Sequence, residues 1–443
     1  MHSSSARIVA IVLLSLISIG SACGYSYVSS AHAQINQNQS PSIDASTTPS
    51  PPQTNTTPTP TVDRNVYPIS ANTLSSPLFS LSQHVGGSGD DEILEVINAG
   101  QDTFVIGVSN SPDKDVCANY QTVFLTKLTT LNLTKTTAIC VNRDEDIGYL
   151  GSKLIQDGIV IITTNSNGIT IHKYSYNLVY LNSTAIPLQS PLSADTYLVE
   201  NDMYLIVENV EGIHLITFDQ SLDVDYCRLV VSDGTLASSL LTANGLLLIS
   251  NHQNSIRMTS IGYDSNVIST SYIHSQSISA IDLCPSLDSS VGANMLLYSL
   301  DGALRIRLLD ISLNCVYDKD VGSGNSGTII PLARGYLVVS YDTQTSTLVC
   351  KHGDILKENV GIKFDNHVVY YQKSNHLILL GTHKEEVFIY GYTDEFEITY
   401  RVTIPRADPI YVDDTLVVLN SSEHVSPYVE GYGGIEGYIL KYN

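Results

Sequence analysis

The sequence predicts an all-β protein, and more narrowly a β-propeller of eight four-stranded blades. Two observations support this fold class. A short segment of strand-forming residues, bounded by turn residues, recurs eight times between residues 102 and 422 with a period near 43 residues. No part of the chain shows sustained helical periodicity with capping residues at its ends. Repeats of this length and texture form four-stranded sheets that stack in a row or close into a ring.

The recurring segment consists of a turn residue, four or five β-favouring residues and another turn. Its eight copies are DTFVIGVSNS from Asp102, DGIVIITTNS from Asp157, NDMYLIVENV from Asn201, NGLLLISNHQ from Asn244, ANMLLYSLDG from Ala293, RGYLVVSYDT from Arg334, NHLILLGTHK from Asn375 and DDTLVVLNSS from Asp413. We therefore expect one such strand in every blade. Three further strands complete each repeat; in the second repeat the four are IGYLGSKLI (147–155), GIVIITTN (158–165), ITIHKYSY (169–176) and STAIPLQ (183–189).

The eighth repeat contains only three predicted strands, PIYV (409–412), TLVVLN (415–420) and GYILKY (437–442). At the other end of the repeat region, PLFSLSQHV precedes the first strand and has no partner in its own repeat. We therefore predict that Leu78–Val85 supplies the fourth strand of the last blade and closes the ring. Closure of this kind removes exposed strand edges, which otherwise favour aggregation. Seven blades is the alternative count.

Residues 1–33 have the features of an export signal. Arg7 precedes an apolar run (residues 8–20) that is short for a membrane span, and Ala31-His32-Ala33 offers a small-residue cleavage site. Two alternatives stay open: Cys23 as a lipid-bearing cysteine, and an uncleaved membrane anchor. Residues 34–73 form a Pro-, Thr- and Ser-rich stalk that is too polar to bury a core, and residues 74–443 hold the propeller. We expect an exported protein, secreted or displayed on the cell surface.

Charge and composition exclude several classes of function. With 44 Asp and Glu against 22 Lys and Arg, the net charge of −22 disfavours nucleic acids and anionic lipids as partners. The absence of Trp argues against WD-repeat, sialidase-type and quinoprotein propellers. GSGNSG (322–327) fits a GxGxxG pattern but has no helix to follow it, and no GxSxG or HExxH motif occurs. We expect no organic cofactor.

The first repeat carries a recognisable set of motifs. A GGSGDD turn leads into a strand, FVIG forms the next strand and FLTKL the one after it. With these motifs, residues 84–133 resemble the repeat of a family of β-propellers found in secreted and surface proteins of bacteria. The family is mostly of unknown activity. The resemblance therefore implies a propeller displayed outside the cell, and it brings no catalytic residues with it.

The stretch HVGGSGDDE (84–92) has two interpretations. In the first, its glycines adopt positive φ where the chain passes from one blade to the next, and Asp90 and Asp91 cap backbone amides of the turn. In the second it contributes to a Ca²⁺ site, since carboxylates at this density suit that cation. The candidate metal ligands are Asp90, Asp91, Glu92, Asp113, Asp115, Asp144 and Asp146. The sequence does not complete a DxDxDG loop.

Two loops between the second and third strands of a blade are long: residues 109–120 in blade 1 and residues 420–434 in blade 8. Ring closure makes those blades neighbours, so both loops are expected side by side on one face, where binding loops commonly lie. The candidate ligand-binding residues on them are Tyr120, Glu423, His424, Tyr428, Glu430 and Tyr432. The alternative is that loops near the chain ends vary freely. Cys117 and Cys140 are predicted to form a disulfide that fixes the first loop.

Three functional hypotheses follow. The first is a non-enzymatic, exported propeller that binds an extracellular protein or glycan through the face with the long loops. The second is an extracellular hydrolase or lyase with carboxylates around the propeller axis. The third is a structural or adhesion scaffold. A closed ring needs no partner to cover its strand edges, so a monomer is expected.

Overall fold

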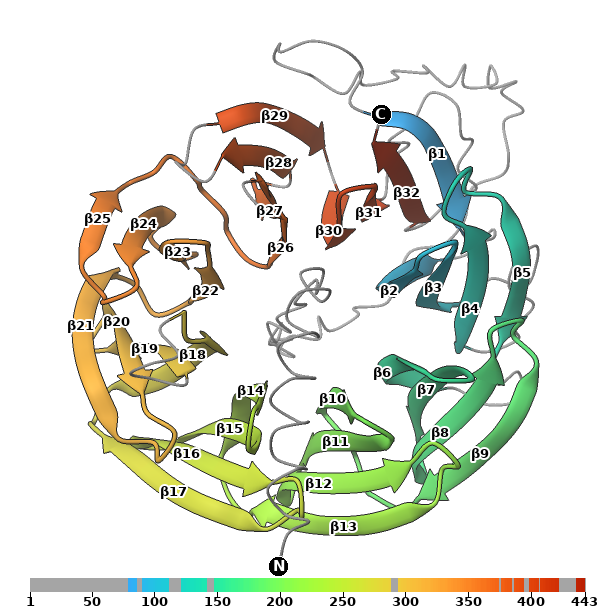
Figure 1. Cartoon of the computed structure of the whole chain (residues 1–443), viewed down its shortest axis with the longest axis horizontal. Helices are drawn as coiled ribbons and strands as arrows, with labels where there is room; N and C mark the ends of the chain where they lie inside the picture. Colours follow the sequence, from blue (N-terminus) through green and yellow to red (C-terminus); the bar gives the residue numbers. More distant parts are fainter. Residues whose placement is uncertain are drawn as a thin grey trace, which may run out of the picture.

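The computed structural model describes residues 79–85, 90–110, 121–141, 147–287, 294–373, 376–384, 386–393, 398–405, 407–421 and 436–442. Its strands form eight antiparallel four-stranded sheets, arranged as the blades of a closed ring (Figure 1). The all-β prediction and the count of eight blades are therefore confirmed. Within the described ranges, no helix has the length and apolar character needed to span a bilayer.

In every blade the strand nearest the axis comes first in sequence, except that the outermost strand of blade 8 is the first strand of the chain (Figure 1). Blade 1 contains β2 (Asp91–Ala99), β3 (Asp102–Ser109), β4 (Thr122–Thr129) and β5 (Lys135–Cys140). Blade 2 contains β6 (Gly148–Ile155), β7 (Gly158–Asn165), β8 (Gly168–Ser175) and β9 (Tyr180–Ile186). Blade 3 contains β10 (Ser193–Val199), β11 (Asp202–Asn209), β12 (Gly212–Asp219) and β13 (Val224–Val231). Blade 4 contains β14 (Thr235–Thr242), β15 (Gly245–His252), β16 (Ser255–Gly262) and β17 (Val267–His274).

The other half of the ring repeats this order. Blade 5 contains β18 (Ile278–Pro285), β19 (Asn294–Leu300), β20 (Ala303–Leu309) and β21 (Cys315–Ser323). Blade 6 contains β22 (Gly327–Pro331), β23 (Gly335–Ser340), β24 (Thr345–Cys350) and β25 (Ile355–Glu358). Blade 7 contains β26 (Val368–Lys373), β27 (His376–His383), β28 (Glu386–Thr393) and β29 (Ile398–Pro405). Blade 8 contains β30 (Ala407–Val412), β31 (Leu416–Ser421), β32 (Glu436–Tyr442) and β1 (Phe79–Val85).

Each of the eight recurring segments forms the second strand of its blade, as the repeat pattern predicted. The fourth strand of blade 2 is the exception in position: it was expected at residues 183–189, and β9 spans Tyr180–Ile186. The reason is a tight turn before it, in which Leu178 has a φ of 59° and its N–H donates to the carbonyl of Ser175. The chain reverses within that turn and starts to pair at once.

The predicted N-terminal closure is present. β1 runs antiparallel to β32, with partners from Phe79 and Tyr442 at one end to Val85 and Gly437 at the other. The strand that precedes the first repeat is thereby hydrogen-bonded to the last strand of the chain. Val85 is 1% exposed, so its side chain belongs to the core.

The hydrophobic core is divided among the blade junctions. Among the residues that the structure describes, eight clusters of buried side chains occur, and each is shared by two consecutive blades, including blades 8 and 1. The second strands contribute to two clusters at once. In β11, Met203 and Leu205 face blade 2, whereas Tyr204 and Ile206 face blade 4. Because alternate side chains point to opposite faces of a sheet and both faces are covered, these strands are apolar throughout.

Candidate functional site

Antiparallel blades place two kinds of connection on one face of the ring: the turns between second and third strands, and the links from each blade to the next. We call this the loop face. The two long loops predicted to bind a ligand belong to it, and so does the link that enters β2. The described residues at the bases of these loops show how the loops are attached.

The first long loop is attached to the start of β2. The hydroxyl of Ser109, the last residue of β3, donates to the carboxylate of Asp91, which is fully buried. Next to it, the Asp90 N–H donates to the Asn110 side-chain oxygen at 2.9 Å, and the Asn110 N–H donates to the Asp90 carbonyl at 3.2 Å. The Asp91 carboxylate thus reaches across the blade to a side-chain hydroxyl. The expectation that Asp90 and Asp91 cap backbone amides of the turn stays a prediction, because residues 86–89 lie outside the described parts of the chain.

The second long loop is attached two residues further along the same strand. Asn420, next to the end of β31, accepts a hydrogen bond from the Ile93 N–H at 2.9 Å and donates to the Ile93 carbonyl at 2.8 Å. Asn420 and Ile93 are both buried. The bases of the two long loops are therefore held side by side on β2, as ring closure predicted.

The residues chosen as ligand contacts lie outside the described parts of the chain. These are Tyr120, Glu423, His424, Tyr428, Glu430 and Tyr432. Their role stays a prediction. The same holds for the disulfide: Cys140 is half-buried at the end of β5 with a free thiol in this structure, and its predicted partner Cys117 is not among the described residues.

The calcium hypothesis also stays a prediction. Asp113, Asp115, Asp144 and Asp146 are not described, and Asp90, Asp91 and Glu92 do not converge, since Asp91 points into the blade and Glu92 toward solvent. No group of three or more potential ligand side chains gathers within the ranges that the structure covers. Negative charge does accumulate beside the link: partial burial, and after it the charge of Asp408, raises the pKa of Glu92. Partial burial raises the pKa of Asp408 as well.

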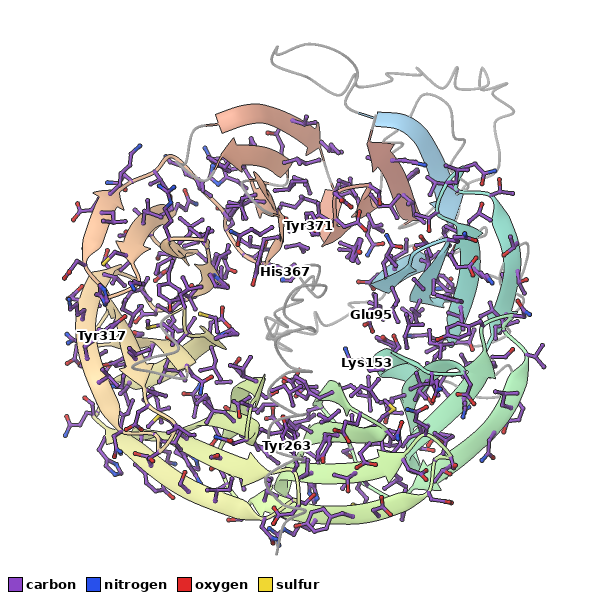
Figure 2. The ribbon with its side chains drawn as sticks, viewed as in Figure 1. Glu95, Lys153, Tyr263, Tyr317, His367 and Tyr371 are labelled. Atoms are coloured by element: carbon purple, nitrogen blue, oxygen red, sulfur yellow. The ribbon has the colours of Figure 1, made fainter. Side chains whose placement is uncertain are left out.

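The inner strands carry a repeated contact that the sequence did not reveal. Within the described ranges, a carboxylate of one inner strand accepts a hydrogen bond from a hydroxyl of the next inner strand at three junctions. The pairs are Glu95 with Ser152 (2.8 Å), Asp195 with Ser239, and Asp282 with Thr328 (2.6 Å). Glu95 and Asp282 each follow a β-bulge in their strand, which turns the side chain toward the neighbouring blade. Figure 2 shows Glu95 and Lys153 on the inner side of the ring.

Electrostatics of these contacts indicate a structural role. Asp282 is half-buried, and desolvation of its carboxylate raises its pKa, although hydrogen bonds from Thr328 and from the N–H of Ile329 act in the opposite direction. Tyr149 donates to Glu95 beside Ser152, and burial, followed by the charge of Glu95, raises the pKa of its phenol well above the ordinary value. Carboxylates that accept hydrogen bonds from a neighbouring blade hold the two blades together.

A groove on blade 4 was also missed. It has a volume of about 590 Å³ and lies at the junction with blade 3, next to the link Asp233-Gly234 and the turn that contains Gln253 and Asn254. Arg257 of β16 and Tyr272 of β17 line it. The sequence contained a signal for this groove. β16 and β20 both have arginine as their third residue, Arg257 and Arg305. The strand after β20 carries Asp318, which binds Arg305, whereas the strand after β16 has no acidic residue.

Comparison with known proteins supports the fold. The Dos1 propeller is 9% identical with a TM-score of 0.50, covering 81% of this chain and 94% of that one. Sqt1 from Chaetomium thermophilum is 11% identical with a TM-score of 0.50, covering 81% of this chain and 97% of that one. No protein-family model matches the chain, and no curated protein matches it significantly. At this level of identity the likeness shows the fold alone, and the chain is a β-propeller.

Proposed function

We propose that this protein is an exported, non-enzymatic β-propeller that binds an extracellular protein or glycan through the loop face at blades 8 and 1. The observation that carries the proposal is the joint attachment of both long loops to β2. Asp91 binds Ser109 at the base of the first loop, and Ile93 binds Asn420 at the base of the second. Long loops on a rigid scaffold are a common form of binding site.

The rest of the molecule supports a binding or scaffold role. The eight shared core clusters make the ring a rigid platform, and the inner-strand carboxylates form hydrogen bonds between blades. The long loops carry tyrosines together with Glu423, His424 and Glu430, side chains that can stack on a ligand and hydrogen-bond to it. Export, which the first 33 residues predict, would place this surface outside the cell.

The test replaces residues 422–434 of the full chain with a Gly-Ser linker of equal length and measures binding to panels of immobilised extracellular glycans and extracellular-matrix proteins. The matched control replaces the tight turn Val210-Glu211 of blade 3, on the same face, with Gly-Ser. We expect the wild type and the control to bind at least one panel component, and the loop variant to lose that binding while its melting temperature is unchanged. Equal binding by the loop variant would contradict the proposal.

The same proteins, melted with Ca²⁺ and with a chelator, test the calcium hypothesis.

A further inference from the structure

The groove on blade 4 contains a cation without a counter-ion among the described residues. Arg257 is half-buried, and its Nε is shielded from solvent without a hydrogen-bond partner. Its guanidinium lies over the ring of Tyr272, whose centroid is 6.0 Å from the guanidinium carbon. A buried donor that lacks an acceptor is unfavourable, and a guanidinium presents several donors in a fixed fork that matches a carboxylate. Arg257 therefore lacks an acceptor, although the carboxylate of Asp233 also lines the groove.

The neighbouring blade shows what a paired arginine looks like in the same place. Arg305 of blade 5 is, like Arg257, the third residue of its strand, and its Nε donates to Asp318 of the adjacent strand at 2.9 Å. In blade 4 the cross-strand neighbour of Arg257 is Tyr272. The cross-strand neighbour of Arg305 is Asp320, so blade 5 has an aspartate at the register position that Tyr272 holds in blade 4. The carboxylate that binds Arg305, Asp318, lies two residues earlier on the same strand.

The residues around Arg257 suit the ring of a bound sugar. Tyr272 is 48% exposed, and its ring stacks on that of His274 with centroids 5.6 Å apart and planes 10° from parallel. The exposed part of the Tyr272 ring can contact the C–H groups of a sugar, and the exposed side chains of Gln253 and Asn254 at the groove edge can hydrogen-bond to its hydroxyls. A volume of about 590 Å³ lies within the range of small-ligand sites.

A hydrolytic use of the groove is not supported by its geometry. His252 lies 3.2 Å from the Ser250 hydroxyl and 3.2 Å from the Asp233 carboxylate, the order found in nucleophilic triads. Ser250, however, is 1% exposed and does not line the groove. A substrate in the groove cannot reach that hydroxyl, so binding is the role that remains.

We propose that the blade 4 groove binds an acidic sugar of the hexuronic acid type, with Arg257 on the carboxylate and Tyr272 under the ring. This goes beyond the function proposed above, because blade 4 lies across the ring from the long loops of blades 8 and 1 (Figure 1). It also concerns a protein of net charge −22, in which an anionic ligand needs a local cation of this kind.

The test is calorimetric titration of the full chain with glucuronate, with acetate (the carboxylate alone) and methyl glucoside (the ring alone) as comparison ligands. We expect glucuronate to bind and both comparison ligands to bind about tenfold more weakly or worse. Arg257→Gln should weaken glucuronate binding by about tenfold or more. The matched control is Arg401→Gln, which removes another arginine that lies over aromatic rings, Phe388 and Tyr390, on blade 7; it should bind as the wild type does.

Two further variants keep the result interpretable. Tyr272→Asp places a carboxylate opposite Arg257, at the register position that Asp320 holds opposite Arg305, so it should abolish glucuronate binding without lowering the melting temperature. Asp233→Asn removes the carboxylate of the groove and should tighten the binding of an anion. Absence of glucuronate binding by the wild type, equal binding by Arg257→Gln, or acetate binding as tight as glucuronate would each overturn the proposal. Replacement of residues 422–434 should leave glucuronate binding unchanged, so failure of this proposal and failure of the loop-face proposal are distinguishable.

Discussion

Asn420 in β31 and Ile93 in β2 are 327 residues apart in sequence, and the Asn420 side chain exchanges two hydrogen bonds with the Ile93 backbone, at 2.9 and 2.8 Å. The side-chain amide thus acts like a backbone group of an additional strand, and it joins the last blade to the first. Asn251 forms the equivalent pair of bonds with Ala280 between blades 4 and 5, at 2.7 and 3.1 Å. The contact is therefore a recurring device of the ring.

Asn420→Ala should lower the free energy of unfolding by about 2 kcal/mol, because it leaves a buried N–H and a buried carbonyl of Ile93 without partners. The measurement is urea denaturation of the full chain. Asn244→Ala, at an exposed turn of blade 4, serves as the control and should change the free energy by less than about 0.5 kcal/mol. Equal effects of the two substitutions would show that the Asn420 contact does not stabilise the ring.

Gly437→Ala should be destabilising because of Ile93. A Cβ added at Gly437 would lie 2.3 Å from Ile93 Cδ1 and 2.4 Å from its Cγ1, in the junction of blades 8 and 1. Overpacking of this kind costs about 1–3 kcal/mol. Ile93→Val removes the nearer methyl, so Gly437→Ala should cost less in that background. A double-mutant cycle by urea denaturation measures the coupling, and a coupling of zero would contradict the close approach.

Asp282 should make stability depend on pH. Burial raises its pKa, so the folded protein holds this proton more tightly than the unfolded chain does. The stabilising contribution of the protonated carboxyl is therefore fully present below the unfolded pKa of about 4 and is lost as the pH rises through the raised folded-state value. Compared with the wild type, Asp282→Asn should show a flatter decline of unfolding free energy above pH 4. Parallel pH profiles of the two proteins would contradict this assignment.

Glu92 and Asp408 should show the same direction of pH dependence with a smaller amplitude. The pKa of Glu92 is raised, first by partial burial and then by Asp408, so its ionisation disfavours the folded state. Glu92→Gln should raise the unfolding free energy at pH 7, and the gain should disappear near pH 4. Both side chains are only partly buried and keep much of their contact with solvent, so screening keeps the gain below about 1 kcal/mol.

A double-mutant cycle extends this prediction. Asp408→Asn should relieve part of the same repulsion between the two carboxylates. The gains in unfolding free energy from the two substitutions should therefore not be additive. Thermal melts of the single and double variants at pH 4 and pH 7 check this. A gain from Glu92→Gln that is larger at pH 4 than at pH 7 would contradict the sign.

The fold was predictable because its signals are local and repeated. Strands such as β11 are apolar on both faces, since Met203 and Tyr204 face different neighbouring blades, and this pattern recurs in each repeat. The closure by β1 followed from counting strands. The start of β9 was predicted wrongly because the turn before it places Leu178 at positive φ, and no glycine in the sequence indicates such a turn.

The sites were less predictable, because they depend on which side chains meet across a junction. Nothing local to Asn420 indicates Ile93 as its partner; that contact requires the register of the whole ring. The carboxylates of the inner strands need the β-bulges, which shift Glu95 and Asp282 toward the next blade. Arg257 stands out only when its strand is aligned with that of Arg305 and the missing aspartate is noticed.

Amide hydrogen exchange of residues 436–442 tests the closed ring most directly. β32 pairs with β31 on one side and with β1 on the other. In the full chain we expect its amides to be protected as strongly as those of β16 in blade 4. In a variant that lacks residues 79–85, exchange in β32 should be much faster, while β16 keeps its protection. Equal protection of β32 with and without residues 79–85 would contradict closure by β1, and with it the placement of the two long loops side by side.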